Sequence, residues 1–85
     1  MVTYISASFE PGLIDSEVLA YFNDVDGNLV EVPVDESLKT HDSFRVFLIR
    51  QEGDRVLIEL PQESSSGHWR VWAPSSLVNP ERASA

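Results

Sequence analysis

The stretch from Phe44 to Val78 constrains the fold more than any other part of the chain, because it is the densest run of strand-forming residues. It predicts a β-hairpin, a polar loop over residues 61–67, a third strand, and a tight helical turn that begins at Pro74. Consecutive strands joined by short connections indicate an all-β fold with antiparallel pairing.

The register of this hairpin follows from its turn. We expect a three-residue loop, Gln51-Glu52-Gly53, with Gly53 in the left-handed backbone conformation. The residues that this loop would place opposite one another are Leu48 and Val56, Val46 and Ile58, Phe44 and Leu60, Arg45 and Glu59, and Arg50 and Asp54.

The other side of the same hairpin is also apolar. Phe47, Ile49 and Leu57 lie there, where a strand with one solvated face would carry polar residues. Two explanations are open: the remaining strands of a closed barrel cover these side chains, or a second chain does. These three residues are therefore our candidate oligomer interface.

The N-terminus is predicted to form a strand over residues 2–9. The side chains expected on one side of it are Thr3, Ile5, Ala7 and Phe9, and Pro11-Gly12 ends the strand with turn chemistry.

The segment from Leu13 to Phe22 fits either a helix that starts at Asp15 or Ser16, or a strand over residues 18–22. Asp26-Gly27 favours the strand, because this pair suits a two-residue type I′ hairpin turn. The residues that such a turn would pair on one apolar face are Leu19 with Val34, Tyr21 with Val32, and Asn23 with Val30. Pro33 then places the second strand at a sheet edge or a bulge.

The remaining segments are read from composition and alternation. Residues 35–43 form either a mobile loop or a single helical turn capped by Asp35.

Trp69 is expected to fill the core on the side of Val71 and Ala73, so that Trp72 faces the other way and is available for recognition. Residues 1–79 are expected to form one domain, followed by a disordered tail over residues 80–85.

Charge excludes several classes of partner. The 85 residues include 14 acidic and 6 basic side chains, and the net charge of −8 repels phosphate backbones and anionic lipids. All of this net charge falls in residues 1–43, which predicts an acidic face on the N-terminal half. There is no cysteine and no apolar run long enough to cross a bilayer. We therefore expect a cytoplasmic protein with no nucleic-acid and no membrane partner.

Three polar motifs fail the templates of chemical sites. His41 and His68 match no zinc-ligand spacing and are expected to be exposed. The segment 24–28 lacks the glycine and glutamate positions of a calcium loop, so it is interpreted as a turn. The serines of residues 64–66 precede His68 but do not form a nucleophile elbow. We expect no enzymatic activity, no metal and no cofactor.

Three sequence segments occur in a recognisable order. They are Leu19-Ala20-Tyr21-Phe22-Asn23, the hairpin centred on Glu52-Gly53-Asp54-Arg55, and Trp72-Ala73-Pro74-Ser75-Ser76-Leu77-Val78. This order, over residues 18–78, resembles that of Src-homology-3-type (SH3-like) small barrels. The resemblance implies a five- to six-stranded antiparallel barrel with one short helical turn near the C-terminus.

The resemblance also implies an aromatic groove for extended proline-rich peptides, to which Tyr21, Phe22, Trp72 and Pro74 would contribute. The chain departs from the family pattern where the groove needs it. Arg55 stands at the position of the central groove tryptophan, and an extra loop over residues 35–43 follows the first hairpin.

The function that we expect is that of a non-enzymatic protein-interaction module or a small accessory subunit. The residues predicted to bind a protein or peptide partner are Tyr21, Phe22, Arg70, Trp72 and Pro74. Two alternatives stay open. One is a homo-oligomer that associates through Phe47, Ile49 and Leu57. The other is an acidic inhibitor or nucleic-acid mimic that presents the carboxylates of residues 10–42 to a basic protein.

Overall fold

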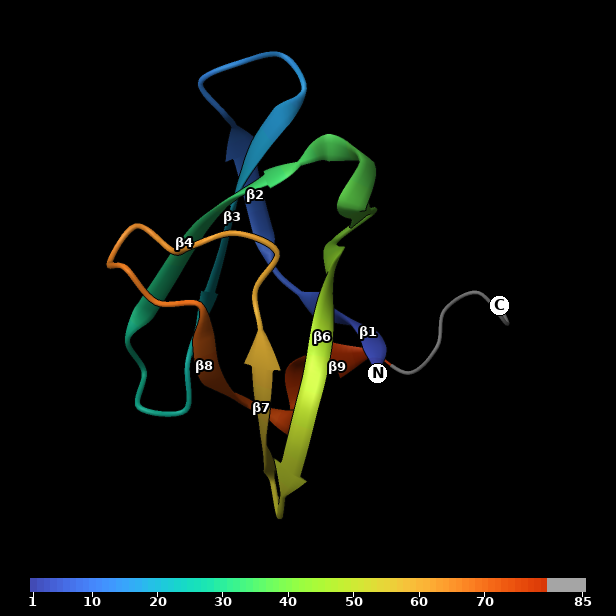
Figure 1. The fold of residues 1–85 in the computed structure, drawn as a ribbon, viewed down its shortest axis with the longest axis vertical. Helices are drawn as coiled ribbons and strands as arrows, with labels where there is room; N and C mark the ends of the chain where they lie inside the picture. The colour runs from blue at the N-terminus through green and yellow to red at the C-terminus, as the bar shows by residue number, and fades with distance from the viewer. Residues whose placement is uncertain (80–85) are drawn as a thin grey trace.

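The computed structural model describes residues 1–79 (Figure 1). Its elements in chain order are β1 (Val2–Ser6), β2 (Ser8–Pro11), β3 (Glu17–Asn23), β4 (Leu29–Asp35), the 3-10 turn η1 (Glu36–Leu38), β5 (Lys39–Thr40), β6 (Ser43–Glu52), β7 (Arg55–Glu59), β8 (Arg70–Pro74), the 3-10 turn η2 (Ser75–Leu77) and β9 (Val78–Asn79). The protein is mainly β with antiparallel pairing, as predicted. The tail predicted over residues 80–85 lies outside the described residues.

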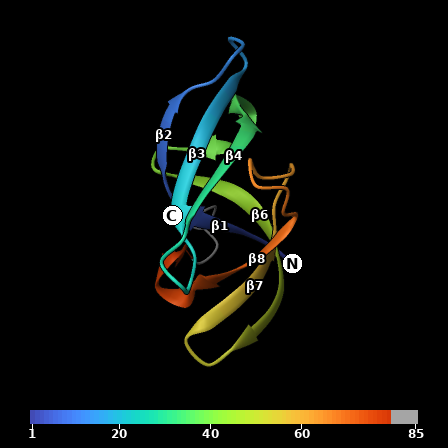
Figure 2. The same ribbon diagram turned by 90° about the vertical axis from the view of Figure 1, so that its left-hand side faces the viewer.

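The strands form two sheets that lie on opposite sides of the core (Figure 2). One sheet has the order β8-β7-β6-β1-β9, with β5 added to β6, and the other has the order β2-β3-β4. The sheets do not close on each other, whereas the sequence predicted a closed barrel of five to six strands. Between the β4 side and the β8 side the described hydrogen bonds are isolated ones, such as Val25 N–H to the Trp72 carbonyl at 3.0 Å.

The predicted N-terminal strand divides at Ala7, and its halves enter different sheets. β1 pairs with β6, whereas β2 pairs with β3. The predicted inward side is confirmed, because Thr3 and Ile5 are buried and Ala7 and Phe9 pack against the core. One short segment therefore ties the two sheets together.

Phe44 of β6 lies at the centre of the core and is fully buried. Its ring meets Phe9 edge-on at 6.3 Å and Phe22 at 6.2 Å, and both of those residues come from the other sheet. The other fully buried large side chains are Ile5, Val32, Val34, Val56 and Ile58. Burial of these aliphatic and aromatic side chains is the main stabilising contribution in a chain without disulfides.

The hairpin of β3 and β4 exists, which confirms the strand rather than the helix for residues 18–22, but its predicted register is wrong by one residue. The observed pairs are Val18 with Val34, Ala20 with Val32, and Phe22 with Val30. The turn is longer than predicted because the Asp24 carboxylate accepts the backbone N–H groups of Asp26 and Asn28, both at 2.9 Å. A shift of one residue exchanges the two faces of β3, so Tyr21 points outward and Phe22 inward.

The predicted register of the β6–β7 hairpin is also wrong, by three residues beside the turn and by two residues beyond Arg50. Gly53 has the predicted positive φ, 61°, but the loop contains two residues, so Glu52 faces Arg55 and Leu48 faces Ile58. An irregularity between Leu48 and Arg50 accommodates the extra residue. Beyond this irregularity the shift is two residues, which preserves the faces, so the predicted core residues of this hairpin are buried or packed against the core all the same.

The charge pairs predicted for this hairpin are replaced by others. Arg50 and Arg55 both pair with Glu52, and Arg70 of β8 pairs with Glu59 at 3.6 Å. The hydrogen bond from Arg50 is the main reason that the pKa of Glu52 is lowered.

Of the two alternatives for residues 35–43, the structure shows the helical turn, and the turn predicted at Pro74 is also present; both are 3-10 turns. η1 is capped by Asp35, whose carboxylate accepts a hydrogen bond from Ser37 N–H at 2.9 Å. Hydrogen bonding from Ser37 stabilises the ionised carboxylate and lowers the pKa of Asp35. Pro33, as predicted, lies in an edge strand, because β4 is at the border of its sheet.

Candidate functional site

The exposed edge of β8 borders a hollow of about 440 Å³. Its walls come from β8, from the loop over residues 24–28 and from the loop over residues 64–68. The two loops are held in place by backbone hydrogen bonds from Val25 N–H to the Trp72 carbonyl and from Ser65 N–H to the Glu31 carbonyl, at 2.8 Å. Trp72 and Arg70, two of the predicted partner-binding residues, line this hollow.

Trp72 is half-buried and carries a cation on its ring. The Arg55 guanidinium lies 4.2 Å from the ring centroid, and the same group reaches Glu52 at 3.5 Å. Stacking of a guanidinium on an indole orients both side chains. Sequence analysis identified Arg55 only as a departure from the SH3-like pattern. In the structure it is part of the wall of this hollow.

The loop over residues 64–68 is ordered by its own side chains. Buried Ser64 accepts the backbone N–H of His68 at 3.0 Å, and the Ser66 hydroxyl lies 3.0 Å from Nδ1 of His68. A hydroxyl beside an imidazole is the first requirement of an activated nucleophile, but among the described residues no carboxylate is hydrogen-bonded to the exposed imidazole. The contacts account for the fold of the loop.

The predicted turn at residues 24–28 is confirmed, and its carboxylate has a structural role. Asp24 is occupied by the two backbone N–H groups that close the loop. Within residues 1–79, no cluster of three or more potential metal-ligating side chains is found. His41 and His68 are exposed, as predicted.

A second hollow, of about 390 Å³, is lined by residues 6–8 of the N-terminal segment and by Tyr21, Phe22, Asn23, Pro74 and Leu77. Phe22 is only 6% exposed, so it contributes its edge to the floor while most of its ring belongs to the core. Tyr21 is half-buried, and its hydroxyl donates to Glu10 at 2.5 Å. That hydrogen bond, with burial and the nearby Glu10 and Glu31 charges, raises the pKa of Tyr21 to about 12.

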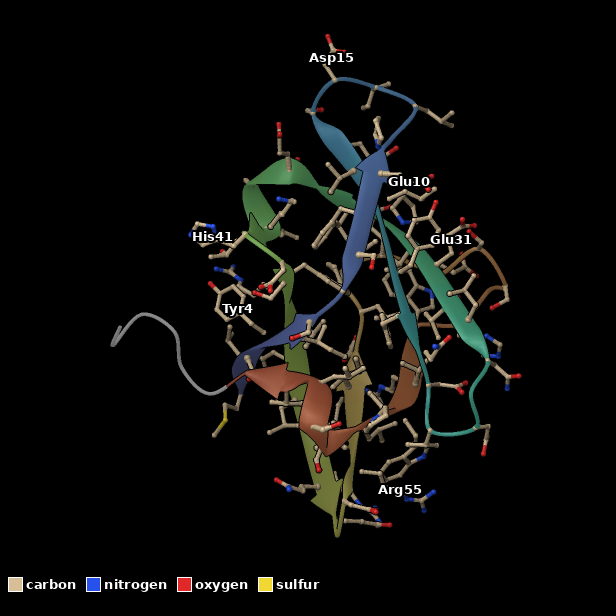
Figure 3. All side chains as sticks on the ribbon, turned by 180° about the vertical axis from the view of Figure 1, so that it is seen from behind. Tyr4, Glu10, Asp15, Glu31, His41 and Arg55 are labelled. Carbon is tan, nitrogen blue, oxygen red and sulfur yellow. The ribbon has the colours of Figure 1, made fainter. Side chains whose placement is uncertain are left out.

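A third hollow, of about 360 Å³, connects the first two. It shares Val25, Asp26 and Arg55 with the hollow beside Trp72, and it shares Pro74 with the hollow beside Tyr21. Figure 3 shows Arg55 beside the loop that joins β3 and β4. The three hollows are neighbours that share lining residues, and we name them together the β8 path. All five predicted partner-binding residues lie along it.

Sequence reasoning predicted a turn at residues 24–28 and a loop at residues 61–67, but not that both line the β8 path. The Asp24 and Ser64 side chains carry the signal, because both residue types bind neighbouring backbone groups in turns. Their placement beside β8, however, depends on contacts with Trp72 and Glu31 that are distant in the sequence.

The predicted second apolar face is exposed in the structure. Phe47 is 50% and Ile49 is 36% exposed, and Leu57 is half-buried beside Trp72 on the neighbouring strand. The assignment of Trp69 to the core is wrong, because its side chain is 51% exposed at the end of the 61–69 loop. Trp69 contributes to the fold through its backbone carbonyl, which accepts Leu60 N–H at 2.8 Å.

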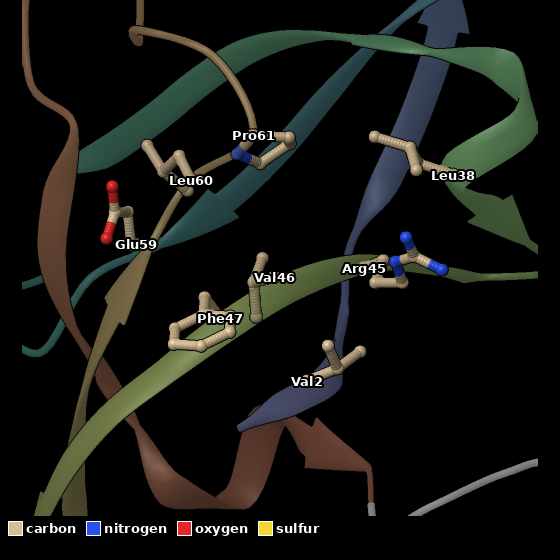
Figure 4. Close-up of a pocket in the computed structure, with 8 residues that line it drawn as sticks. All are labelled: Val2, Leu38, Arg45, Val46, Phe47, Glu59, Leu60 and Pro61. Atoms are coloured by element: carbon tan, nitrogen blue, oxygen red, sulfur yellow. The ribbon is translucent and has the colours of Figure 1, made fainter.

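A separate hollow of about 420 Å³ lies on this face (Figure 4). It is lined by Val2, Leu38, Arg45, Val46, Phe47, Glu59, Leu60 and Pro61. Its floor is apolar, since Val46 and Leu60 are core residues, and its rim carries one cation and one anion.

Comparison of the chain with protein-family models, with curated proteins and with solved structures found no match. None of the helical segments in residues 1–79 has the length and apolar character of a membrane-spanning helix. The functional argument therefore rests on the surfaces described above.

Proposed function

We propose that this protein is a non-catalytic interaction module that binds an extended peptide segment of a partner along the β8 path. The observation that carries this proposal is that the three hollows adjoin one another: Val25, Asp26 and Arg55 line both the first and the third, and Pro74 lines both the second and the third. An extended segment needs a run of shallow subsites rather than one deep cavity.

The lining of the β8 path indicates the chemistry of the segment. Trp72, Tyr21 and Pro74 offer flat apolar walls, which suit proline and aliphatic side chains. Asp26 and Asp54 border the middle hollow, and Asp54 makes no ion pair within residues 1–79. A net charge of −8 adds long-range attraction for cations. The preferred ligand is an apolar, proline-containing segment with a basic residue.

The SH3-like resemblance is part of the same proposal. We interpret the two sheets as a small barrel of this type that is open between β4 and β8, with the β8 path in place of the aromatic groove. The stacked pair of Trp72 and Arg55 takes the place of the missing groove tryptophan. This interpretation supports a peptide ligand, and the binding measurement below tests it.

The test is a selection from a random peptide library, followed by affinity measurements on the enriched peptides with three proteins. Trp72→Ala removes a wall of the β8 path, and we expect it to weaken binding by about 10- to 100-fold, as for a buried aromatic anchor. Trp69→Ala is the matched control, because Trp69 is a half-exposed tryptophan that lines none of the three hollows. We expect this variant to bind within about twofold of the original protein.

Two results would contradict the proposal. One is a selection that enriches no peptide family. The other is an equal loss of affinity in the Trp72 and Trp69 variants, which would show that binding does not depend on the β8 path. Chemical-shift changes on peptide addition should map to residues 21–26 and 70–74, and changes confined to β1 and β6 would also reject it.

A further inference from the structure

The exposed face of the larger sheet carries a pattern that the peptide-binding proposal does not use. The register places Val2 opposite Phe47, and Phe47 opposite Glu59, on three adjacent strands. Val2 is 47% and Phe47 is 50% exposed, and both line the hollow of Figure 4. We name these residues, with Arg45 and the rest of the hollow's lining, the outer face.

Arg45 is distinctive among the cations of residues 1–79. Arg50, Arg55 and Arg70 have carboxylate partners, and Lys39 lies 4.9 Å above the ring of Phe9. Arg45 makes no ion pair or ring contact with another described residue, and it stands exposed at the rim of an apolar hollow. Its guanidinium is free to meet a carboxylate from outside the chain.

The hollow carries a carboxylate of its own, Glu59, on the opposite rim. Glu59 pairs with Arg70 at 3.6 Å within the chain, but its side chain stays 41% exposed and can accept a second guanidinium. In Figure 4, Glu59 lies across the hollow from Arg45, and Pro61 lies across it from Val2. A two-fold axis that lies in the plane of the face and passes between Arg45 and Glu59 therefore brings Arg45 of one copy against Glu59 of the other. The apolar side chains between them then meet apolar side chains of the other copy. The outer face is complementary to itself in charge and in apolar content.

We infer that the outer face is the interface of a two-fold symmetric homodimer. Arg45 of one protomer pairs with Glu59 of its partner, and the reverse pair forms by symmetry. The apolar side chains between the two ion pairs are then removed from water, as in the centre of other interfaces.

The overall charge of the chain supports a second copy at this place in particular. Two chains of net charge −8 repel each other, and the net negative charge lies in residues 1–43, whereas residues 44–85 are neutral. The outer face is built mainly from the neutral half. Among the charged residues that line the hollow, Arg45 and Glu59 balance. Two copies therefore approach here without a cluster of opposed carboxylates.

The test is charge reversal with complementation, measured as molar mass by light scattering and sedimentation over about a hundredfold range of concentration. The original protein is expected to form a dimer that grows no further, because a two-fold interface closes. Arg45→Glu and Glu59→Arg each create two like-charge contacts, and we expect each to raise the dimer dissociation constant by about 100-fold. Leu13→Glu, at a highly exposed position in the loop between β2 and β3, should leave dimerisation unchanged.

The decisive step is to mix the two variants. The Arg45→Glu protomer presents carboxylates at both positions of the interface, and the Glu59→Arg protomer presents guanidinium groups at both. Both ion pairs therefore reform between unlike protomers, and a heterodimer is expected from two proteins that are monomeric alone. This recovery also shows that each variant is folded.

A monomer of the original protein at all concentrations overturns the inference, as does open-ended growth, an unaffected dimer in either variant, or a mixture that stays monomeric. Trp72→Ala should leave the dimer unchanged, so the dimer and the peptide-binding proposal fail independently.

Discussion

The two sheets of this protein bury one shared core but present different outward faces. On the smaller sheet, β3 and β4 place Tyr21 opposite Glu31, and the outward hydroxyl of Tyr21 binds Glu10 of β2. On the larger sheet, the outward positions include Phe47 and Leu57. An antiparallel sheet needs only one buried face. The apolar outer face of the larger sheet therefore is not required by the fold, which is why we propose it as an interface.

The same contrast appears in charge. β2, β3 and β4 belong to the half of the chain that carries the net charge, and Figure 3 shows Glu10, Asp15 and Glu31 along the smaller sheet. The larger sheet draws β6, β7 and β8 from the neutral half. An asymmetry along the sequence thus becomes an asymmetry between two sides of the molecule. The charged side, on the smaller sheet, is well solvated. The larger sheet carries little net charge, so a second chain meets less repulsion there.

The largest expected effect breaks the feature that both sheets share. Phe44→Ala removes the ring that contacts Phe9 and Phe22 of the smaller sheet, and we expect a loss of about 3–5 kcal/mol in the free energy of unfolding. Phe47→Ala, on the same strand but facing outward, should cost less than about 1 kcal/mol in the monomer. Urea denaturation followed by tryptophan fluorescence measures both values.

Equal losses for these two phenylalanines would show that the outer face is packed as tightly as the core. Separate unfolding transitions for the two sheets would contradict a shared core, because Phe44 couples them. Dilute protein should be used, so that dimer dissociation does not add to the measured stability.

A smaller effect tests which side of β3 faces the core. Ala20 is fully buried opposite Val32, so Ala20→Leu adds volume to a filled space and should cost about 1–3 kcal/mol. Leu19 is half-buried on the other face, and Leu19→Ala should cost about 1 kcal/mol or less. The register predicted from an Asp26-Gly27 turn would reverse this ranking, since it places Leu19 inward. Thermal unfolding of the two variants distinguishes the registers.

The smallest effect concerns the solvated face and appears only in alkali. Tyr21 has a folded pKa of about 12 against an ordinary value of 10.0, mainly because its hydroxyl donates to Glu10. A raised pKa means that this contribution to stability is complete below pH 10 and is lost as the pH rises from 10 to about 12. Ultraviolet titration should show one of the two tyrosines ionising late.

Glu10→Gln removes the charge and weakens the acceptor, so we expect it to lower the pKa of Tyr21 toward 10.0. Tyr21→Phe should remove the late titration altogether. A late titration that persists in the Tyr21→Phe protein would assign it to Tyr4 and contradict the role of Glu10.

Much of the local structure was predictable because it depends on local chemistry. Gly53 has the positive φ that its turn requires. Asp35 caps the 3-10 turn that follows it, and Pro74 precedes the second 3-10 turn. The buried faces of β6 and β7 were also predictable even though the pairing was wrong. Beyond the irregularity at residues 48–50 the shift is two residues, and an even shift preserves the side on which each residue lies. The exposure of Phe47 and Ile49 needed structural information, because an apolar face on a strand does not say what covers it.

The β3–β4 hairpin shows where local chemistry is insufficient. Asp26-Gly27 suits a two-residue turn, but the Asp24 carboxylate closes a longer loop, and the odd shift exchanges Tyr21 with Phe22. Of the predicted partner-binding residues, Phe22 consequently lies mostly in the core. Trp69 was misassigned for a related reason, since alternation does not extend beyond the end of a strand.

By itself, the sequence determined that the protein is mainly β, which residues make turns, which side of the second hairpin is buried, and that its negative charge lies in one half. Only the tertiary structure decided that the strands form two unclosed sheets, that the loops over residues 24–28 and 64–68 meet β8, and that Arg45 and Glu59 lie on opposite sides of one hollow. The physical reason is the separation along the chain of the residues that interact. Turn and strand preferences are set by neighbouring residues, whereas sheet closure and surface complementarity depend on contacts between residues distant in the chain.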